Sequence, residues 1–340
     1  MSKKLNHDYL AKMFVEDGRR FSDIVNGFLF KGKQCALSEG VLEKNSEILS
    51  SFGTFNGKSF ILKKYRDVYK RITLKTDGKA IYALVGIENQ RFIDYGMVVR
   101  AMMYDALGYN IQIRDLQKKK RMGIAGVSKK ARRNSKNARQ NDSGEYLYGL
   151  GEEDELLPVV TIVIYWGTER WKGPRSLREL LAWTKCPELL EVIPDYRFLL
   201  LEPGRMSDKE LSRFITDVRC VFECIRYSSN KKKLSRIIHQ YSDRWLLDSD
   251  TVQLINCCTG SKFCIESKHS GEKINMCKAI DDMVNDGYNK GKREGEKSGF
   301  SKGKKAVIQS IKASMKALGY SNDQIKLILN SLGKTEASSV

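Results

Sequence analysis

The spacing of apolar and polar residues changes period along the first third of the chain. Between Phe60 and Leu74, apolar or β-branched residues alternate with basic ones, and a second apolar run covers Ala80–Ile87. Alternation of this kind is typical of half-buried strands, and the Asp77-Gly78 pair between the runs favours a hairpin turn. Beyond Gln90 the period approaches 3.6, which predicts a helix over about 92–118. The pattern therefore predicts strand, turn, strand and helix.

The same reading extends along the rest of the chain. Val159–Trp166 is apolar almost throughout, as expected of a strand buried on both faces. A second apolar strand is predicted over Tyr196–Glu202. Helical spacing is found over 5–30, with a break at Asp17-Gly18, and over 176–184, 208–227, 231–245, 306–319 and 321–332. Strands thus alternate with helices, which predicts an α/β domain whose mixed sheet is covered by helices, followed by a helical C-terminal tail.

The domain organisation follows from shifts in composition. We expect one domain over 1–250, interrupted by a basic insert at 118–145, and a connector over 251–285. A glycine-repeat segment over 286–304 and a helical hairpin over 305–333 complete the chain. In the repeat, Gly287, Gly291, Gly295, Gly299 and Gly303 recur at every fourth position.

Glycine in a helix costs about 1 kcal/mol relative to alanine, so the repeat predicts either close packing against a partner or partial disorder. The hairpin offers a small apolar face suited to docking or to a homo-oligomer.

The charge of the chain points to a polyanionic partner. The formal net charge is +19, which favours nucleic acid, although a basic tail that only maintains solubility is an alternative. The segment from Lys118 to Arg139 contains no acidic residue and is interrupted by Gly, Ser and Asn, which predicts a disordered loop. Its basic residues are candidates for phosphate contacts: Lys118, Lys119, Lys120, Arg121, Lys129, Lys130, Arg132 and Arg133.

Several classes of protein are disfavoured. The chain has no apolar run of eighteen residues and no apolar core behind its basic start, so neither a membrane span nor a secretory signal is expected. The eight cysteines form no CxxC pair and only three histidines are present, which argues against a zinc site. Reduced thiols in a cytoplasmic protein are the default expectation.

Acidic side chains in the two predicted strands suggest a metal-binding site. Residues i and i+2 of a strand share a face, so Glu88 and Gln90 point one way and Asn89 the other. Asp67, in the first predicted strand, can reach the edge where Glu88 lies. Two carboxylates that meet there repel each other unless a cation lies between them, and Mg²⁺ favours such all-oxygen ligands. A solvated or capped carboxylate is the alternative at a strand end.

These residues carry a resemblance to a known family. YRDVYK, which contains Asp67, followed by GIENQ, which contains Glu88 and Gln90, resembles the core of the PD-(D/E)XK phosphodiesterases. More narrowly, the chain resembles the bacterial recombination-promoting nuclease / putative transposase family. FSDIVNGFLFKGKQ, RAMMYDALGY and LLPVVTIVIYWGTERWKGPRSLREL support this resemblance, which covers most of residues 5–245.

The resemblance implies a restriction-endonuclease-like fold and a DNA endonuclease that depends on Mg²⁺ or another divalent cation. Asp67 and Glu88 would be metal ligands, and Gln90 stands where the superfamily carries lysine. Asp23, within the apolar pattern of the first helices, stands where the superfamily often has a further helical acid. Arg100 and Tyr104 are four residues apart, so they are expected to share a face of the helix that flanks the active site in the family. Both are candidates for a phosphate contact, and an Arg100 that only faces solvent is the alternative.

Gln90 keeps other interpretations open. Its amide carries no charge, so it cannot neutralise a developing phosphorane as lysine would, and the general base is not identified. A DNA-binding or regulatory module that no longer cuts is therefore the main alternative to a nuclease. A structural protein that assembles through the C-terminal hairpin is a third interpretation.

Overall fold

The structure is a computed structural model that describes residues 7–43, 47–55, 58–76, 79–121, 150–151, 153–181, 187–263 and 273–335 of the 340-residue chain. It divides into two compact units, Met1–Cys277 and Lys278–Val340. The first unit thus extends past the predicted domain end at residue 250. No helix among the described residues has the length and apolar character needed to cross a membrane.

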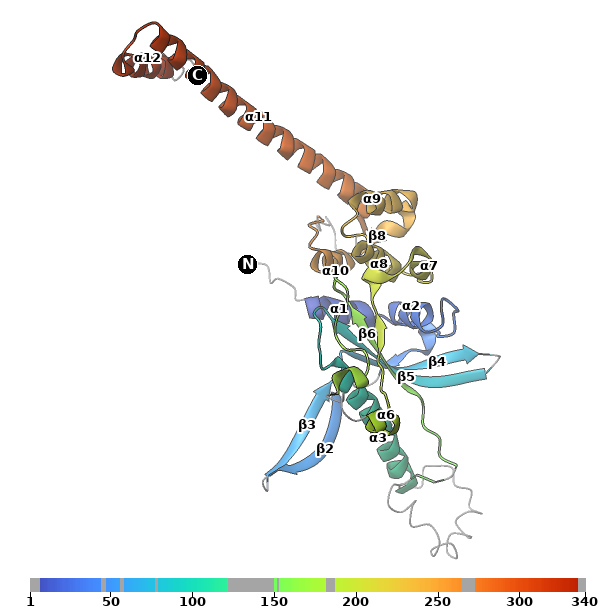
Figure 1. Cartoon of the computed structure of the whole chain (residues 1–340). Coiled ribbons are helices and arrows are strands. Elements are labelled where there is room, and N and C mark those ends of the chain that lie inside the picture. The colour runs from blue at the N-terminus through green and yellow to red at the C-terminus, as the bar shows by residue number, and fades with distance from the viewer. Residues whose placement is uncertain are drawn as a thin grey trace, which may run out of the picture. The chain divides into compact units, whose positions relative to one another are not determined.

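A mixed five-stranded sheet lies at the centre of the first unit (Figure 1). Its order is β1-β4-β5-β6-β7. Strand β4 is antiparallel to β5, whereas β5 and β6, and β6 and β7, run parallel. The strands are β1 (Leu42–Glu43), β4 (Val68–Thr76), β5 (Lys79–Gln90), β6 (Val159–Tyr165) and β7 (Leu199–Leu201). The predicted mixed sheet with covering helices is confirmed.

The predicted hairpin is present, but its first strand is interrupted. Strands β4 and β5 pair up to Thr76 and Lys79, on either side of turn residues 77 and 78, which lie outside the described residues. The prediction of one strand over residues 60–74 is wrong. β3 (Lys58–Tyr65) pairs with β2 (Glu47–Phe55) in a separate sheet. The chain changes sheets where the Arg66 side chain enters the interior, so Asp67 stands in the break before β4.

Helices cover both faces of the large sheet. On one face, α3 (Met97–Arg121) packs Met97, Val98 and Ala101 against Val163 and Tyr165 of β6. On the other face lie α1 (His7–Glu16) and α2 (Gly18–Phe28). The predicted break between these two helices is confirmed, because Asp17 caps α2 by accepting hydrogen bonds from the backbone N–H groups of Arg19 and Arg20.

The second half of the unit departs from the predicted helices. Residues 176–181 form a β-bridge from Ser176 to Arg197 and a 3₁₀ turn at Arg178–Leu180, not part of an α-helix. The predicted helix over 208–227 is broken, and the one over 231–245 ends early and continues as 3₁₀ turn Ser242–Trp245. The α-helices are α6 (Pro187–Val192), α7 (Asp208–Leu211), α8 (Val218–Arg226), α9 (Lys231–Gln240) and α10 (Ser249–Thr259); β8 (Leu246–Leu247) pairs with β9 (Ile274–Asn275).

The C-terminal unit is helical, as predicted, with different boundaries. α11 (Met276–Ala317) is one helix that includes the glycine repeat, and α12 (Asn322–Thr335) follows. The connection has Gly319 at φ +85, and Ser321 and Gln324 cap α12 through reciprocal hydrogen bonds. A Cβ atom built on any of the five repeat glycines would have no neighbour within 4 Å among the described residues.

Candidate functional site

The break before β4 and the end of β5 bring Asp67 beside Glu88. Val68 is the register partner of Ile87 in this antiparallel pair, so Asp67, one residue before Val68, lies opposite Glu88, one residue after Ile87. The Asp67 carboxylate oxygen Oδ2 accepts a hydrogen bond of 2.7 Å from the backbone N–H of Asn89. The two carboxylates are close enough that the charge of Asp67 raises the pKa of Glu88.

The predicted alternation along β5 is confirmed. Asn89 points to the face of α1 and α2, where its Oδ1 atom accepts a hydrogen bond of 2.9 Å from the indole of Trp166. Glu88 points to the opposite face, where it meets Arg100 of α3. Gln90 lies two residues beyond Glu88 on the same strand and is half-buried, so it belongs to the face of Glu88.

Glu88 is buried with only half of its carboxylate paired. The residue is 0% exposed, and its Oε2 atom accepts a hydrogen bond of 3.3 Å from Arg100. Its Oε1 atom is buried and has no hydrogen-bond partner among the described residues. Burial raises the pKa of Glu88 to about 8, and the charge of Asp67 adds to the effect, whereas Arg100, Arg66 and the backbone N–H of Asp67 oppose it.

Asp67 shares this environment. Burial raises the pKa of its carboxyl group, while the N–H of Asn89 and the charge of Arg100 lower it. The charges of Asp8 and Lys12 on α1 also act on Asp67, the first raising and the second lowering its pKa. Neither α1 residue was a candidate in the sequence, because no motif connects that helix to the strand end.

Arg100 is held at the solvent side of the pair. Its side chain is 37% exposed, and its guanidinium bonds Asp94 at 2.6 Å as well as Glu88 at 3.3 Å. Burial lowers the pKa of Arg100, but bonds to Asp94 and Tyr104 and the charge of Glu88 outweigh burial and raise it overall. The predicted sharing of a helix face by Arg100 and Tyr104 is confirmed by this contact. Arg100 is therefore a permanent cation beside the two carboxylates.

A second arginine lies beneath the pair. The buried Arg66 donates hydrogen bonds to Asp105 at 3.0 Å and to Thr161 at 2.9 Å. Asp105 also accepts a bond of 2.6 Å from the hydroxyl of Tyr196. Gly86 makes room for this arginine, because a Cβ atom there would come within 2.3 Å of Arg66 Nη1. These contacts fix the backbone immediately before Asp67.

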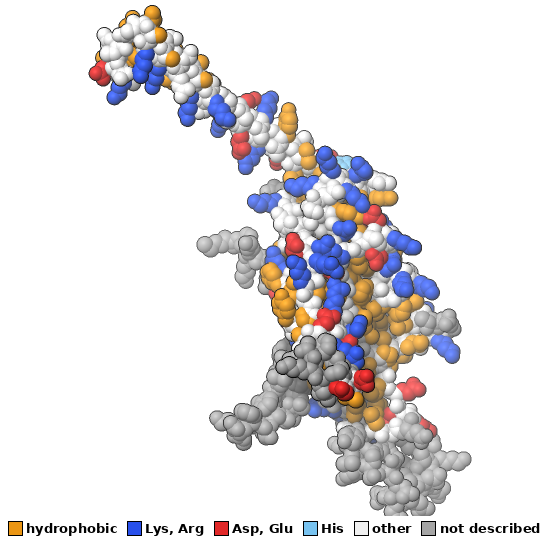
Figure 2. Space-filling view, viewed as in Figure 1, with side chains coloured by type: hydrophobic (Ala, Val, Ile, Leu, Met, Phe, Trp, Pro, Cys, Tyr) orange, Lys and Arg blue, Asp and Glu red, His pale blue; other side chains and the backbone are white. Residues whose placement is uncertain are grey.

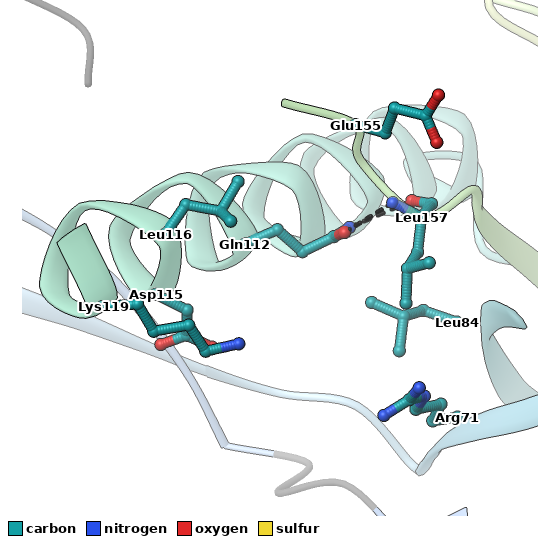
Figure 3. A pocket seen from close by; sticks show the side chains of 8 residues that line it. All are labelled: Arg71, Leu84, Gln112, Asp115, Leu116, Lys119, Glu155 and Leu157. Atoms are coloured by element: carbon teal, nitrogen blue, oxygen red, sulfur yellow. Dashed lines mark hydrogen bonds between the residues drawn. The ribbon is translucent and has the colours of Figure 1, made fainter. Parts of the chain in front are cut away.

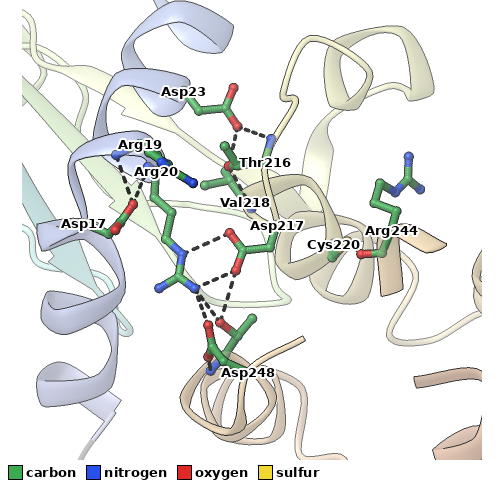
Figure 4. Close-up of polar contacts among 11 residues, drawn as sticks. Asp17, Arg19, Arg20, Asp23, Thr216, Asp217, Val218, Cys220, Arg244 and Asp248 are labelled. Atoms are coloured by element: carbon green, nitrogen blue, oxygen red, sulfur yellow. Dashed lines mark hydrogen bonds and ion pairs between the residues drawn. The ribbon is translucent and has the colours of Figure 1, made fainter. Parts of the chain in front are cut away.

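The structure places Asp23, the third predicted metal ligand, against residues 215 and 216 and not with Asp67 and Glu88. Its carboxylate accepts hydrogen bonds of 3.0 and 3.1 Å from the N–H of Ile215. It also accepts one of 2.8 Å from the N–H and one of 2.6 Å from the hydroxyl of Thr216 (Figure 4). Within the described part of the chain, no group of three or more His, Cys, Asp or Glu side chains is placed to hold a metal ion. Asp23 instead holds the segment that interrupts the predicted helix at 208–227.

Beside Asp23 lies an ion-pair cluster that binds α2 to α10. Arg20 bonds Asp217 at 2.6 Å, Asp248 at 2.5 Å and Thr251 at 3.0 Å (Figure 4). All three partners lie near the N-terminal ends of α8 and α10, where carboxylates are favoured by the helix dipole. These side chains bond one another, so we assign the cluster a structural role in holding the helices together.

The predicted phosphate contacts are only partly described. Arg100 lies beside the carboxylate pair, as above. Lys118 is exposed near the end of α3, and Lys120 pairs with Asp154. The Arg121 side chain and residues Lys129, Lys130, Arg132 and Arg133 lie outside what the structure describes. The predicted loop began at Lys118, but residues 118–121 belong to α3, and the loop residues from 122 on are not described.

Lys119 lines a pocket of about 250 Å³ with Arg71, Asp115 and Glu155 (Figure 3). Gln112 also lines it and bonds the backbone of Leu157. The pocket mixes both signs of charge and is not lined by Asp67 or Glu88. It is therefore separate from the candidate site.

The sequence of the second half matches a known family. Residues 145–252 match the family described as "putative transposase, YhgA-like". No curated protein and no solved structure matches the chain. The matched segment includes β6 and β7, which continue the sheet from β5. Asp67 and Glu88 precede the matched segment in the sequence and are not part of it. The match therefore says nothing about the carboxylate pair itself.

Proposed function

We propose that the protein is a metal-dependent DNA endonuclease that hydrolyses phosphodiester bonds at Asp67 and Glu88. The observation that carries the proposal is the buried Glu88 oxygen Oε1, which has no partner among the described residues. An unpaired buried carboxylate oxygen costs free energy unless a ligand satisfies it. Its neighbour is a second carboxylate, so the ligand that fits between them is a cation.

Mg²⁺ suits these donors. It is commonly held by one or two carboxylates while retaining waters and binding substrate phosphates, so a third acidic ligand is not required. Asp67 and Glu88 would hold the ion. When bound, such a metal polarises the phosphoryl group and lowers the pKa of its water.

Arg100 would supply the positive charge that Gln90 lacks. Its guanidinium is partly exposed at the solvent side of Glu88, and a planar guanidinium can bind two phosphate oxygens. There it would neutralise charge that develops on the phosphate during attack by water. The Gln90 amide, on the face of Glu88, would orient water by hydrogen bonding. Asp94 would keep Arg100 in position.

The substrate is assigned as DNA on two grounds. The first is the net charge of +19, and Lys and Arg side chains are spread over the face drawn in Figure 2. The second is the match of residues 145–252 to a family described as putative transposases, since transposases as a class act on DNA. The arrangement of helix, antiparallel strand pair, helix and parallel strand around the carboxylates supports a restriction-endonuclease-like core.

The test is nicking of supercoiled plasmid with Mg²⁺ by the wild-type protein, Glu88→Ala and Asp67→Asn, with an EDTA control. We expect nicking by the wild-type protein alone, abolished by EDTA. Tyr241→Ala, a change of an exposed residue on another element, is the matched control and should nick as the wild type does. Equal nicking by the wild type and Glu88→Ala would overturn the assignment of the site.

A DNA-binding module that does not cut is the second candidate. It is favoured by Gln90, which cannot replace the lysine charge, and by the pairing of Arg100 with Glu88, which satisfies half of the carboxylate without metal. Tight DNA binding without nicking by any variant, and without an effect of Mg²⁺ on the melting temperature, would establish it in place of the nuclease.

A further inference from the structure

The loop between β5 and α3 exposes two aromatic side chains next to the carboxylate pair. Phe92 is 75% exposed and Tyr95 is 64% exposed. Both lie within seven residues of Glu88, in the short segment that leads to Arg100. Single exposed apolar residues are common on proteins, but two large aromatic residues beside a charged site call for a ligand with apolar faces.

The loop is fixed in a way that directs these rings outward. Ile93, between them, packs against the cluster formed by α3, β6 and Trp171. Asp94 bonds the backbone N–H of Gly96 at 2.8 Å and Arg100 at 2.6 Å. Because the two middle residues are held inward, Phe92 and Tyr95 remain in solvent on either side of them. Their exposure is therefore built into the loop.

Positive charge accompanies the rings. The guanidinium carbon of Arg91 lies 5.5 Å from the centroid of the Phe92 ring, and Arg91 is itself exposed. Arg100 lies beyond Asp94 at the carboxylates. An aromatic surface interleaved with arginine suits a nucleic acid strand whose bases stack while its phosphates meet the cations. In an uninterrupted duplex the faces of the bases are not available for such stacking.

We propose that Phe92 and Tyr95 form a stacking surface for unpaired bases, and that the substrate is DNA with a single-stranded segment. This inference rests on the proposed nuclease function, since it names the substrate class of that site. A single strand and a duplex with an unpaired bubble present the same chemistry, so both are arms of the test. Docking of a protein or of a second copy on this loop is the competing outcome.

The test measures binding in EDTA, so that cutting does not contribute. A DNA strand with 2-aminopurine near its centre, the same strand in a full duplex, and a duplex with a bubble at that base are titrated with protein. The wild-type protein should bind the single strand and the bubble at least about tenfold more tightly than the duplex and change the 2-aminopurine fluorescence. The double variant Phe92→Ala/Tyr95→Ala should lose about tenfold or more in affinity for the unpaired arms and little for the duplex.

Two further variants identify the cause of any loss. Phe300→Ala removes a phenylalanine that is 76% exposed in the C-terminal unit and should leave all three affinities unchanged. Phe92→Leu/Tyr95→Leu keeps apolar surface without a ring and should behave like the alanine variant if stacking is responsible. Circular dichroism melts confirm that the variants are folded.

Equal affinity of the wild type for the single strand and the duplex would overturn the inference. Unchanged DNA binding by the double alanine variant would also overturn it. If the only change in that variant were a lower molar mass by light scattering, the loop would be assigned to contact between copies of the chain. These results are independent of cleavage. Binding that depends on Phe92 and Tyr95 without nicking would keep the stacking surface as a DNA-binding site but refute the nuclease. Nicking without such dependence would keep the nuclease and refute the stacking surface.

Discussion

Asp23 and Glu88 are both buried carboxylates, but their surroundings differ. Asp23 is 2% exposed and accepts hydrogen bonds from two backbone N–H groups and one hydroxyl. Glu88 is 0% exposed, has one bond of 3.3 Å to Arg100, and keeps one oxygen without a partner among the described residues. The first carboxylate is used by the fold, and the second is left available to a ligand.

The difference shows why burial alone does not identify a functional acid. Burial raises the pKa of both groups, and a neighbouring carboxylate adds to the rise in each, Asp217 at Asp23 and Asp67 at Glu88. The rise is opposed at Asp23 by hydrogen bonds from Thr216 and Ile215, and at Glu88 chiefly by the charges of two arginines. Hydrogen bonds from the protein stabilise a carboxylate, but the lone pairs that accept them are no longer available to bind a ligand. The partners of a buried acid therefore decide its role better than its exposure does.

The largest effect is expected from Glu88→Gln. This variant keeps the shape of the side chain but removes the charge that would hold a cation, so nicking should fall by at least about a hundredfold. Its fold should persist, because Arg100 is partly exposed and keeps its ion pair with Asp94. The measurements are plasmid nicking and a thermal melt. Asp23→Asn, the matched change at the other carboxylate, should keep most of the nicking activity; loss of activity in both variants alike would remove the distinction between the two sites.

Asp23→Ala should have the opposite profile. It leaves the N–H groups of Ile215 and Thr216 without their acceptor, so the free energy of unfolding should fall by about 3 kcal/mol. Nicking per folded molecule, measured well below the melting temperature, should stay within about twofold of the wild type. An unchanged urea midpoint together with lost nicking would return Asp23 to the active site.

Titration of Glu88 should make the stability of the protein depend on pH. The pKa of Glu88 is about 8 in the folded protein and 4.5 ordinarily, so the folded state binds the proton more tightly. The free energy of unfolding should therefore fall as the pH rises from about 4.5 to about 8, by at most about 1.4 kcal/mol per pH unit. The measurement is the difference between the wild type and Glu88→Gln in EDTA.

Mg²⁺ should offset this loss in the wild type above pH 8, because the cation binds the ionised pair. It should have no such effect on Glu88→Gln. Parallel pH curves for the two proteins would mean that Glu88 does not titrate in this window.

Two glycine substitutions compare the packing around the two carboxylates. In Gly86→Ala the new Cβ would lie 2.3 Å from Arg66 Nη1, and in Gly27→Ala it would lie 2.5 Å from the Phe214 ring. Each should lower the free energy of unfolding by roughly 1–3 kcal/mol. Only Gly86→Ala should also slow nicking at a permissive temperature, because Arg66 fixes the backbone before Asp67. Equal nicking by both variants would show that this support is not needed.

The smallest effect concerns α11. Gly291→Ala and Gly295→Ala should each stabilise this helix by at most about 1 kcal/mol, because the added methyl groups enter open space among the described residues. Gly319→Ala, at φ +85, is the control and should destabilise the turn before α12. Far-ultraviolet circular dichroism during melting measures both. A fall in molar mass with Gly291→Ala would instead indicate a partner packed on the glycines.

The sequence predicted the local parts of the site better than the connections between distant parts. The hairpin, the alternation at Glu88 and Asn89, and the break at Asp17 follow from period and capping, which neighbouring residues determine. The role of Asp23 could not be predicted in this way, because its partners at 215 and 216 lie almost two hundred residues away. The break in the strand at Arg66 was not predicted for the same reason. The buried Arg66 side chain donates hydrogen bonds to Asp105 and Thr161, which lie on other elements.

The parallel pairing of β5 with β6 has a consequence for dissection of the protein. Glu88 is the register partner of Val163, so the strand that carries the carboxylate also supplies the hydrogen bonds along one side of β6. A fragment limited to the family-matched residues 145–252 would begin after β5 and expose that side of an almost wholly buried apolar strand. Such an edge is a template for intermolecular strand addition, so we expect this fragment to aggregate when it is produced alone.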